Sequence, residues 1–205
     1  YMGYQMNSLD AGASSFSMKN CEINRNNIIS GDDGLYLDNY EYWGSRMYND
    51  SHASFGNIYI SENFVDSDDD GLYISEIEYM AYYIYDNSSA IFGHQEINSN
   101  TIYADYNGIY IDYIFYENGY EMYGNSKAQF GHCEINGNNI LETGSDGIYV
   151  YEVYECGAYM YGNSSFSMEN FEICYNNIES PSDGIYVYYI EYLGYYLYDD
   201  SSATF

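Results

Sequence analysis

Apolar residues recur along the chain in one pattern that repeats every 18 to 20 residues. Each repeat reads apolar, any, apolar, any, any, apolar, any, apolar, and a last apolar residue follows about five positions later, as in Phe16, Met18, Cys21, Ile23 and Ile28. Successive repeats begin at Phe16, Leu35, Ala53, Leu72, Ala90, Ile109, Ala128, Ile148, Phe166 and Ile185. Self-similarity at a short, fixed period is typical of a solenoid, whose units bury their apolar faces only by stacking on one another.

The apolar spacing also predicts the secondary structure. Steps of 2, 3, 2 and 5 residues, in segments rich in Ile, Val, Tyr and Phe, fit short strands joined at corners. Strands stacked in register would be parallel and about 4.8 Å apart, so ten coils would form a rod roughly 50 Å long. We therefore predict an all-β fold, a parallel β-helix (β-solenoid) of about ten 18–20-residue coils that forms one domain over residues 1–205 and is open at both ends.

Two kinds of coil alternate, which gives a longer period of 36 to 39 residues. Type A coils share one Asn, which we predict to form a hydrogen-bonded ladder at a corner; the ladder residues are Asn26, Asn63, Asn100, Asn138 and Asn176. Type B coils open with Gly-Ile-Tyr-Val or a close variant. The Gly follows Asp or Asn, so we expect a corner with positive φ at Gly34, Gly71, Gly108, Gly147 and Gly184.

A row of carboxylates lies just before the central apolar residue of the coils. Seven of the ten equivalent positions are Glu, and the other three are aromatic: Glu22, Glu41, Tyr59, Glu78, Glu96, Phe115, Glu134, Tyr154, Glu172 and Glu191. Carboxylates stacked about 4.8 Å apart repel one another by roughly 1 kcal/mol in water. Two interpretations stay open: outward exposure with screening by salt, or calcium ions that bridge neighbouring pairs. The calcium ligands would be Glu22 with Glu41 and Glu78 with Glu96, aided by the Asp-rich corners at Asp32, Asp33 and Asp68 to Asp70.

Tyrosine is the most unusual component of the chain, with 32 residues. One predicted row contains Tyr36, Tyr73, Tyr110, Tyr149 and Tyr186, and a second contains Tyr48, Tyr85, Tyr123, Tyr161 and Tyr198. Because a type A coil lies between successive members, we expect them about 9.6 Å apart. Such rows offer rigid contact area on the outside of a rod. Lateral self-association and carbohydrate stacking both fit them, and we favour self-association because the rows run the full length of the rod.

The cysteines and histidines give few further signals. Cys156 and Cys174 share an offset in adjacent coils, so we predict a disulfide between them and an oxidising compartment. Cys21 and Cys133 are interpreted as free buried thiols, since they lie six coils apart. His94 and His132 share an offset but are two coils apart, too far for a shared metal ion without other ligands. No sequence motif of a catalytic centre is present.

Three asparagines lie in glycan-acceptor patterns, each in the turn that ends a type B coil: Asn49, Asn87 and Asn163. The alternative is that Asn and Ser are simply good turn formers. The sequence leaves these two interpretations equal.

The charge of the chain restricts its partners. The formal net charge is -28, with only four Lys and Arg residues. Nucleic acid and anionic membrane surfaces are excluded, because their binding depends on cations that neutralise phosphate. No apolar run is long enough to predict a membrane span. Basic partners, metal cations and other copies of the chain remain as partners.

Two segments resemble the right-handed parallel β-helix repeat of pectate-lyase-like proteins and of many archaeal and bacterial cell-surface proteins: Glu-Ile-Asn-Gly-Asn-Asn-Ile at 134–140 and Gly-Ile-Tyr-Val at 147–150. For an enzyme of this type, the resemblance implies acidic calcium ligands and a basic catalytic residue in one groove. The basic residues here share no acidic groove in the sequence; they are Lys19, Arg25, Arg46 and Lys127. The uniform coils also lack the long insertions that build active-site walls, so we predict no enzymatic activity.

The sequence thus predicts a structural protein of an extracellular filament, sheath or surface layer, located outside the cell or on its surface. It would assemble with copies of itself through the open ends of the solenoid and the tyrosine-lined sides. The alternative is a polysaccharide-binding or polysaccharide-cleaving β-helix protein.

Overall fold

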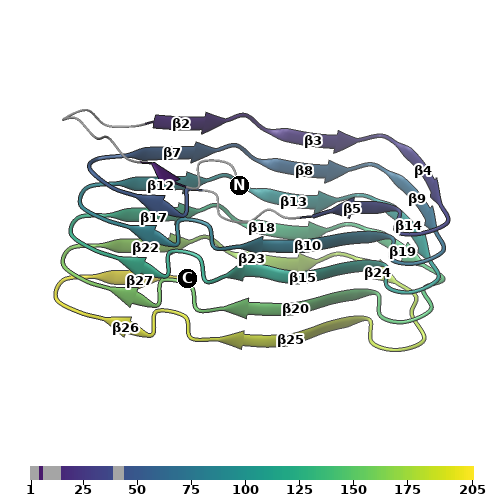
Figure 1. The fold of residues 1–205 in the computed structure, drawn as a ribbon. Coiled ribbons are helices and arrows are strands. Elements are labelled where there is room, and N and C mark those ends of the chain that lie inside the picture. The colour runs from purple at the N-terminus through teal and green to yellow at the C-terminus, as the bar shows by residue number, and fades with distance from the viewer. Residues whose placement is uncertain (1–4, 7–14, 39–43) are drawn as a thin grey trace.

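The computed structural model describes residues 5–6, 15–38 and 44–205, and every secondary-structure element in this part of the chain is a β-strand. Figure 1 shows the chain winding into a parallel β-solenoid of about five turns. Each complete turn contributes one strand to each of five parallel sheets, which we name B, C, D, E and A in the order in which the chain passes through them. The all-β, parallel solenoid predicted from the sequence is confirmed.

Sheets B, C and D follow one another along the chain. Sheet B contains β2 (Ser15–Met18), β7 (His52–Phe55), β12 (Ser89–Phe92), β17 (Lys127–Phe130), β22 (Ser165–Met168) and β27 (Ser202–Thr204). Sheet C contains β3 (Cys21–Asn24), β8 (Ile58–Ser61), β13 (Gln95–Asn98), β18 (Cys133–Asn136) and β23 (Phe171–Cys174). Sheet D contains β4 (Asn27–Ser30), β9 (Phe64–Ser67), β14 (Thr101–Ala104), β19 (Asn139–Leu141) and β24 (Asn177–Ile178).

Sheets E and A complete the turn. Sheet E contains β5 (Leu35–Leu37), β10 (Leu72–Glu78), β15 (Ile109–Tyr116), β20 (Ile148–Tyr154) and β25 (Ile185–Glu191). Sheet A contains β1 (Gln5–Met6), β6 (Arg46–Met47), β11 (Tyr83–Ile84), β16 (Glu121–Met122), β21 (Tyr159–Met160) and β26 (Tyr196–Leu197). In Figure 1, sheets B and C lie along one long side of the turn and sheet E along the other.

The length of the turn corrects the sequence prediction. From β2 onward, paired residues are 37 to 39 positions apart, as in Ser15 with His52 and Ile109 with Ile148. Each turn therefore consists of one type A and one type B coil, which form its two halves. The described turns stack to a height of about 24 Å, half of the predicted rod.

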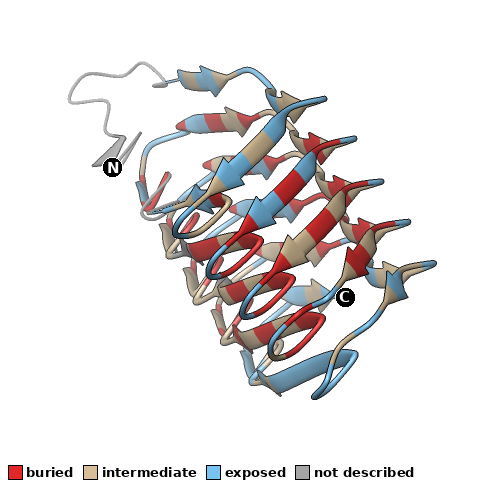
Figure 2. Cartoon of the chain, turned by 90° about the vertical axis from the view of Figure 1, so that its right-hand side faces the viewer, coloured by how far each residue is buried: buried red, intermediate tan, exposed pale blue. Residues whose placement is uncertain are grey.

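Stacked apolar side chains fill the space between the sheets, and Figure 2 shows buried residues through the middle turns. Phe55, Phe92 and Phe130 stack ring on ring, with centroids 4.6 and 4.4 Å apart. In the next turn of sheet B, Phe166 lies over Ala128 and Met168 lies over Phe130. Phe therefore replaces Ala at the first of these positions, and Met replaces Phe at the second, so the core stays filled although the sequence changes.

The regularly spaced glycines before sheet E have a different cause from the one predicted. None of the five has a positive φ. A Cβ on Gly108 would lie 2.6 Å from the carbonyl oxygen of Gly147 and would also clash with the side chain of Ile140. Gly71 and Gly147 face the same obstacles in their own turns. Glycine is needed here because successive turns approach too closely for a side chain.

Candidate functional site

The two predicted tyrosine rows are present as continuous rows of neighbouring rings, and their members lie closer together than expected. Ring centroids in the row from Tyr36 to Tyr186 are 4.9, 4.9, 5.1 and 5.1 Å apart. Those in the row from Tyr48 to Tyr198 are 4.9, 5.0, 4.7 and 4.9 Å apart. The wider spacing predicted from the sequence is wrong because members of a row occupy adjacent turns.

A third row, in sheet A, lies beside the row from Tyr48 to Tyr198, with ring centroids 6.4 Å apart for Tyr83 and Tyr85 and 6.3 Å apart for Tyr196 and Tyr198; we call these two neighbouring rows the tyrosine face. Strand pairing brings together Arg46, Tyr83, Glu121, Tyr159 and Tyr196 in this row. Of the ten positions in these two rows, eight are Tyr, one is Arg and one is Glu. In a chain of formal net charge -28, this surface is therefore low in charge.

The ring geometry determines which atoms the second row presents to a partner. Its rings are almost parallel, with interplanar angles of 6°, 3°, 6° and 5°. Each ring face is covered by the neighbours above and below it, so the row presents ring edges and phenolic hydroxyls. Burial raises the pKa of Tyr85 to about 12 and also raises the pKa of Tyr123. These hydroxyls therefore stay protonated and able to donate well above neutral pH.

The predicted asparagine ladder is present at the corner between sheets C and D. Asn100 is typical: its Oδ1 accepts hydrogen bonds from the backbone N and Nδ2 of Asn63 at 3.0 and 2.9 Å. Its Nδ2 donates to the carbonyl of Ile60 at 2.9 Å and to Oδ1 of Asn138 at 3.0 Å. Asn26 and Asn176 extend the same pattern to the outer turns.

A second ladder lies at the corner between sheets D and E, which the sequence analysis interpreted only as a turn. Oδ1 of Asp70 accepts the backbone N–H of Asn107 at 2.9 Å, and Oδ1 of Asn107 accepts that of Asp146 at 3.1 Å. Asp33 and Asp183 continue the ladder at its two ends. Asp70 is 5% exposed, and burial raises its pKa to about 6. The Asp or Asn before each glycine is the signal that identifies this ladder.

Of the two calcium pairs predicted in the glutamate row, the structure does not bring Glu78 and Glu96 together. Glu22 pairs with Tyr59, which in turn pairs with Glu96. Glu78 pairs with Tyr116, and Glu41 lies outside the described residues. Glu78 and Glu96 are half a turn apart along the chain, in sheets E and C, so they lie in opposite halves of a turn and this pair is wrong. The pair of Glu22 with Glu41 stays a prediction.

The Asp-rich corners do meet, because they lie one turn apart. One carboxylate oxygen each from Asp32, Asp33 and Asp69 lie within 4.8 Å of one another. Asp70, one of the predicted ligands, is committed to the buried ladder instead, and Asp68 is exposed. The cluster therefore forms an acidic corner that faces solvent.

The predicted Cys156–Cys174 disulfide is wrong, because the structure has no disulfide at any of the four cysteines. Cys174 ends β23 in sheet C and pairs with Asn136, whereas Cys156 follows β20 at the corner between sheets E and A. The two cysteines are half a turn apart along the chain, which places them on different sides of the turn. The same change of period removes the argument for an oxidising compartment.

The predicted glycan acceptors lie together at the corner between sheets A and B. Nδ2 of Asn87 donates to Asp50 at 2.7 Å, and Nδ2 of Asn163 donates to Asn125 at 3.0 Å. Both asparagines are exposed, as is Asn49. Glycosylation of these residues stays a prediction.

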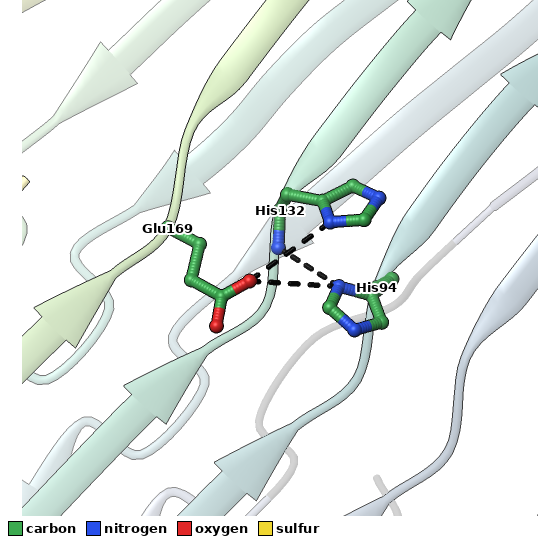
Figure 3. Close-up of side chains that lie close together, drawn as sticks. All are labelled: His94, His132 and Glu169. Carbon is green, nitrogen blue, oxygen red and sulfur yellow. Dashed lines mark hydrogen bonds and ion pairs between the residues drawn. The ribbon is translucent and has the colours of Figure 1, made fainter.

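The change of period brings together two histidines that the sequence analysis had separated. His94 precedes β13 and His132 precedes β18, one turn apart, and their ring centroids are 4.0 Å apart. Nδ1 of His94 lies 3.8 Å and Nδ1 of His132 lies 3.9 Å from Oε2 of Glu169 (Figure 3). The spacing between the histidines equals that between Asn100 and Asn138, and this match was the signal that could have shown the contact.

Two more glutamates surround the ring of His132. Its Nε2 lies 3.4 Å from Oε1 of Glu96 and 3.7 Å from Oε2 of Glu134. This nitrogen is buried and has no hydrogen-bond partner. A cleft of about 330 Å³ opens beside it, lined by His132, Glu134, Glu169, Asn170 and Glu172.

Comparisons with known proteins do not assign the chain to a family. No protein-family model matches it, and no similar curated protein or solved structure was found. Among the residues that the structure describes, no helix is long and apolar enough to cross a membrane.

Proposed function

We propose that the protein is a non-enzymatic structural rod that associates side by side with copies of itself through the tyrosine face, as part of a filament, sheath or surface layer outside the cell. The observation that carries this proposal is the continuity of the row from Tyr48 to Tyr198, which runs through every turn from β6 to β26 without interruption. A row of identical groups at a fixed spacing matches the same row on another copy at many points at once.

The low charge of the tyrosine face makes it a better contact surface between copies than the other sides of the rod. Two chains of net charge -28 repel each other, and contact through the tyrosine face, which has one carboxylate in its two rows, minimises the repulsion. Salt near physiological strength screens charges beyond about 8 Å. Association should therefore strengthen as ionic strength increases.

The last turn supports a second contact along the axis of the rod. Ile185 and Ile190 are 47% and 55% exposed there, although the equivalent Ile148 and Val153 of the preceding turn are buried. Figure 2 shows the exposed surface of this turn. A further turn of the same pattern, from a continuing chain or from a second copy, would cover these side chains and extend all five sheets.

The alternative of polysaccharide binding has less support from the ring geometry. Sugars stack on exposed ring faces, and the row from Tyr48 to Tyr198 covers its faces within the stack. The resemblance to pectate-lyase-like proteins is a resemblance of β-solenoid architecture. Incubation of the chain with acidic polysaccharides, followed by assays for retention and cleavage, separates this alternative from self-association.

The test is a triple variant, Y85S/Y123S/Y161S, studied by sedimentation velocity and electron microscopy between 0.02 and 0.5 M salt, a range of roughly 20 to 4 Å in screening length. The wild-type chain should form side-by-side bundles at high salt, and the variant should stay dispersed. Y106S/Y175S is the matched control, because these two tyrosines are 53% and 88% exposed but lie outside the tyrosine face. A wild-type chain that stays monomeric at high concentration, with salt and calcium present, would overturn the proposal.

A further inference from the structure

The pair His94 and His132 occupies positions at which neighbouring turns carry asparagine. At this corner between sheets B and C, Oδ1 of Asn20 accepts the backbone N–H of Asn57 at 3.0 Å, and Oδ1 of Asn57 accepts that of His94 at 2.9 Å. His94 continues the ladder through Nδ1, which accepts the backbone N–H of His132 at 3.2 Å. An asparagine serves this structural role in the other turns, so the fold does not require imidazole here.

The imidazoles have a geometry suited to a shared ligand. Ligand atoms of His94, His132 and Glu169 all lie within 4.8 Å of one another. Two ligands on one tetrahedral zinc ion are about 3.4 Å apart, given bond lengths of about 2.0 to 2.2 Å. The observed separations of 3.8 and 3.9 Å from Glu169 are close to this value, and Glu169 is exposed and free to adjust.

The surroundings add a second, independent observation. The buried Nε2 of His132 has no hydrogen-bond partner and lies between the carboxylates of Glu96 and Glu134. The cleft beside it is lined by three glutamates and has no Lys or Arg in its lining. A concave site with one sign of charge concentrates the opposite ion, so this corner attracts cations and lacks a protein group that neutralises it.

We propose that His94, His132 and Glu169 bind one divalent transition-metal ion, with zinc as the best match, and leave its fourth position to water. Imidazole nitrogen with one carboxylate suits zinc, whereas calcium prefers ligands that are all oxygen. The ion replaces the 3.2 Å hydrogen bond on Nδ1 of His94, which is longer than the two others described in this ladder. Because the three ligands come from three successive turns, the ion would tie these turns together.

The experiment measures zinc binding to the whole chain by competition with a chromophoric chelator, with excess calcium present to occupy exposed carboxylates. One zinc ion per chain is expected. H94N and H132N should each weaken binding at least tenfold and keep the fold, because asparagine already occupies this ladder in other turns. E169Q should weaken it as well.

His52 provides the matched control, since it is exposed on sheet B and contacts Ser89 rather than this cluster. H52N should bind zinc as the wild type does. Cobalt in place of zinc should give visible absorption bands that H94N/H132N lacks. The proposal is overturned if the wild type binds no zinc in excess calcium, or if H94N/H132N binds it with unchanged affinity.

Discussion

The corners on either side of sheet D and the tyrosine face use the same device for different purposes. Both stack identical or related side chains one strand spacing apart through successive turns. At the corners the groups are buried and hydrogen bonded to backbone, as for Asn100, which is 1% exposed. On the tyrosine face the rings stack, but their hydroxyl edges stay outside. The inner ladders therefore hold the turns in register, whereas the outer rows are available for contacts.

The largest loss of stability should come from a substitution at the corner between sheets D and E. Gly108→Ala places a Cβ 2.6 Å from the backbone oxygen of Gly147, and backbone cannot move aside without separating the turns. We expect unfolding free energy to fall by about 3 kcal/mol, measured by chemical denaturation. Gly184→Ala is the matched control, because no atom lies within 4 Å of its Cβ position; its effect should stay within about 0.5 kcal/mol. Equal losses in both variants would refute the close-approach explanation.

The buried amide ladder should give the next largest effect. Asn100→Ala removes four hydrogen bonds and leaves the Ile60 carbonyl and the Asn63 backbone N–H without partners. The expected loss is about 3 kcal/mol or slightly less, because buried polar groups that lose a partner cannot turn to water. Asn26→Ala should cost below about 1 kcal/mol, since Asn26 is exposed and water can replace its bonds. Thermal and denaturant unfolding of the two variants would check this difference between their losses of stability.

These inner ladders also show how far the sequence could lead. The asparagines at 26, 63, 100, 138 and 176 predicted a stacked corner, and the alternation of apolar positions predicted a parallel solenoid. Both follow from local chemistry: short strands need apolar faces, and a buried amide needs a partner. The tyrosine rows were found for the same reason, because equivalent positions carry the same residue.

The length of the turn was the part that sequence patterning missed. The two halves of a turn share the same apolar spacing, so a half-turn looks like a complete repeat. The disulfide between Cys156 and Cys174, the pair of Glu78 with Glu96 and the separation of His94 from His132 all followed from this one error. The ladder asparagine occurs once per 37 or 38 residues, and this longer period was the correct one.

The glycines before sheet E were missed for a different physical reason. Asp-Gly and Asn-Gly are typical turn pairs, and positive φ was the local expectation. Their actual role depends on atoms one turn away, such as the carbonyl oxygen of Gly147 near Gly108. A close approach between turns is a tertiary property that no local window contains.

Substitutions on the tyrosine face should weaken assembly and leave stability nearly unchanged. Y85F/Y123F/Y161F keeps the ring stacks and removes the outward hydroxyls, so unfolding free energy should change by less than about 1 kcal/mol in total. Bundling should still weaken, with a concentration threshold at least tenfold higher, because each lost hydrogen bond between copies is worth about 1 kcal/mol. Sedimentation at fixed salt measures the threshold. Unchanged bundling would show that ring edges rather than hydroxyls make the contact.

The smallest effect on stability should come from Asp70, the most buried acidic residue of the inner ladders. Burial raises the pKa of Asp70 to about 6, above its value of about 3.9 in an unfolded chain. The folded state therefore holds this proton more tightly, and the stability that it contributes is complete below about pH 4 and is lost as the pH rises through 6.

Asp70→Asn should remove this dependence, because Asn107 already serves the same ladder position in the next turn. At pH 7 the variant should be more stable than the wild type by on the order of 1 kcal/mol, and the difference should vanish near pH 4. Melting temperature measured from pH 4 to 7 gives the comparison. Asp66→Asn is the control: this exposed carboxylate in sheet D should leave the slope unchanged. A wild-type slope that persists in Asp70→Asn would assign the pH dependence to repulsion among the surface carboxylates instead of to the buried ladder.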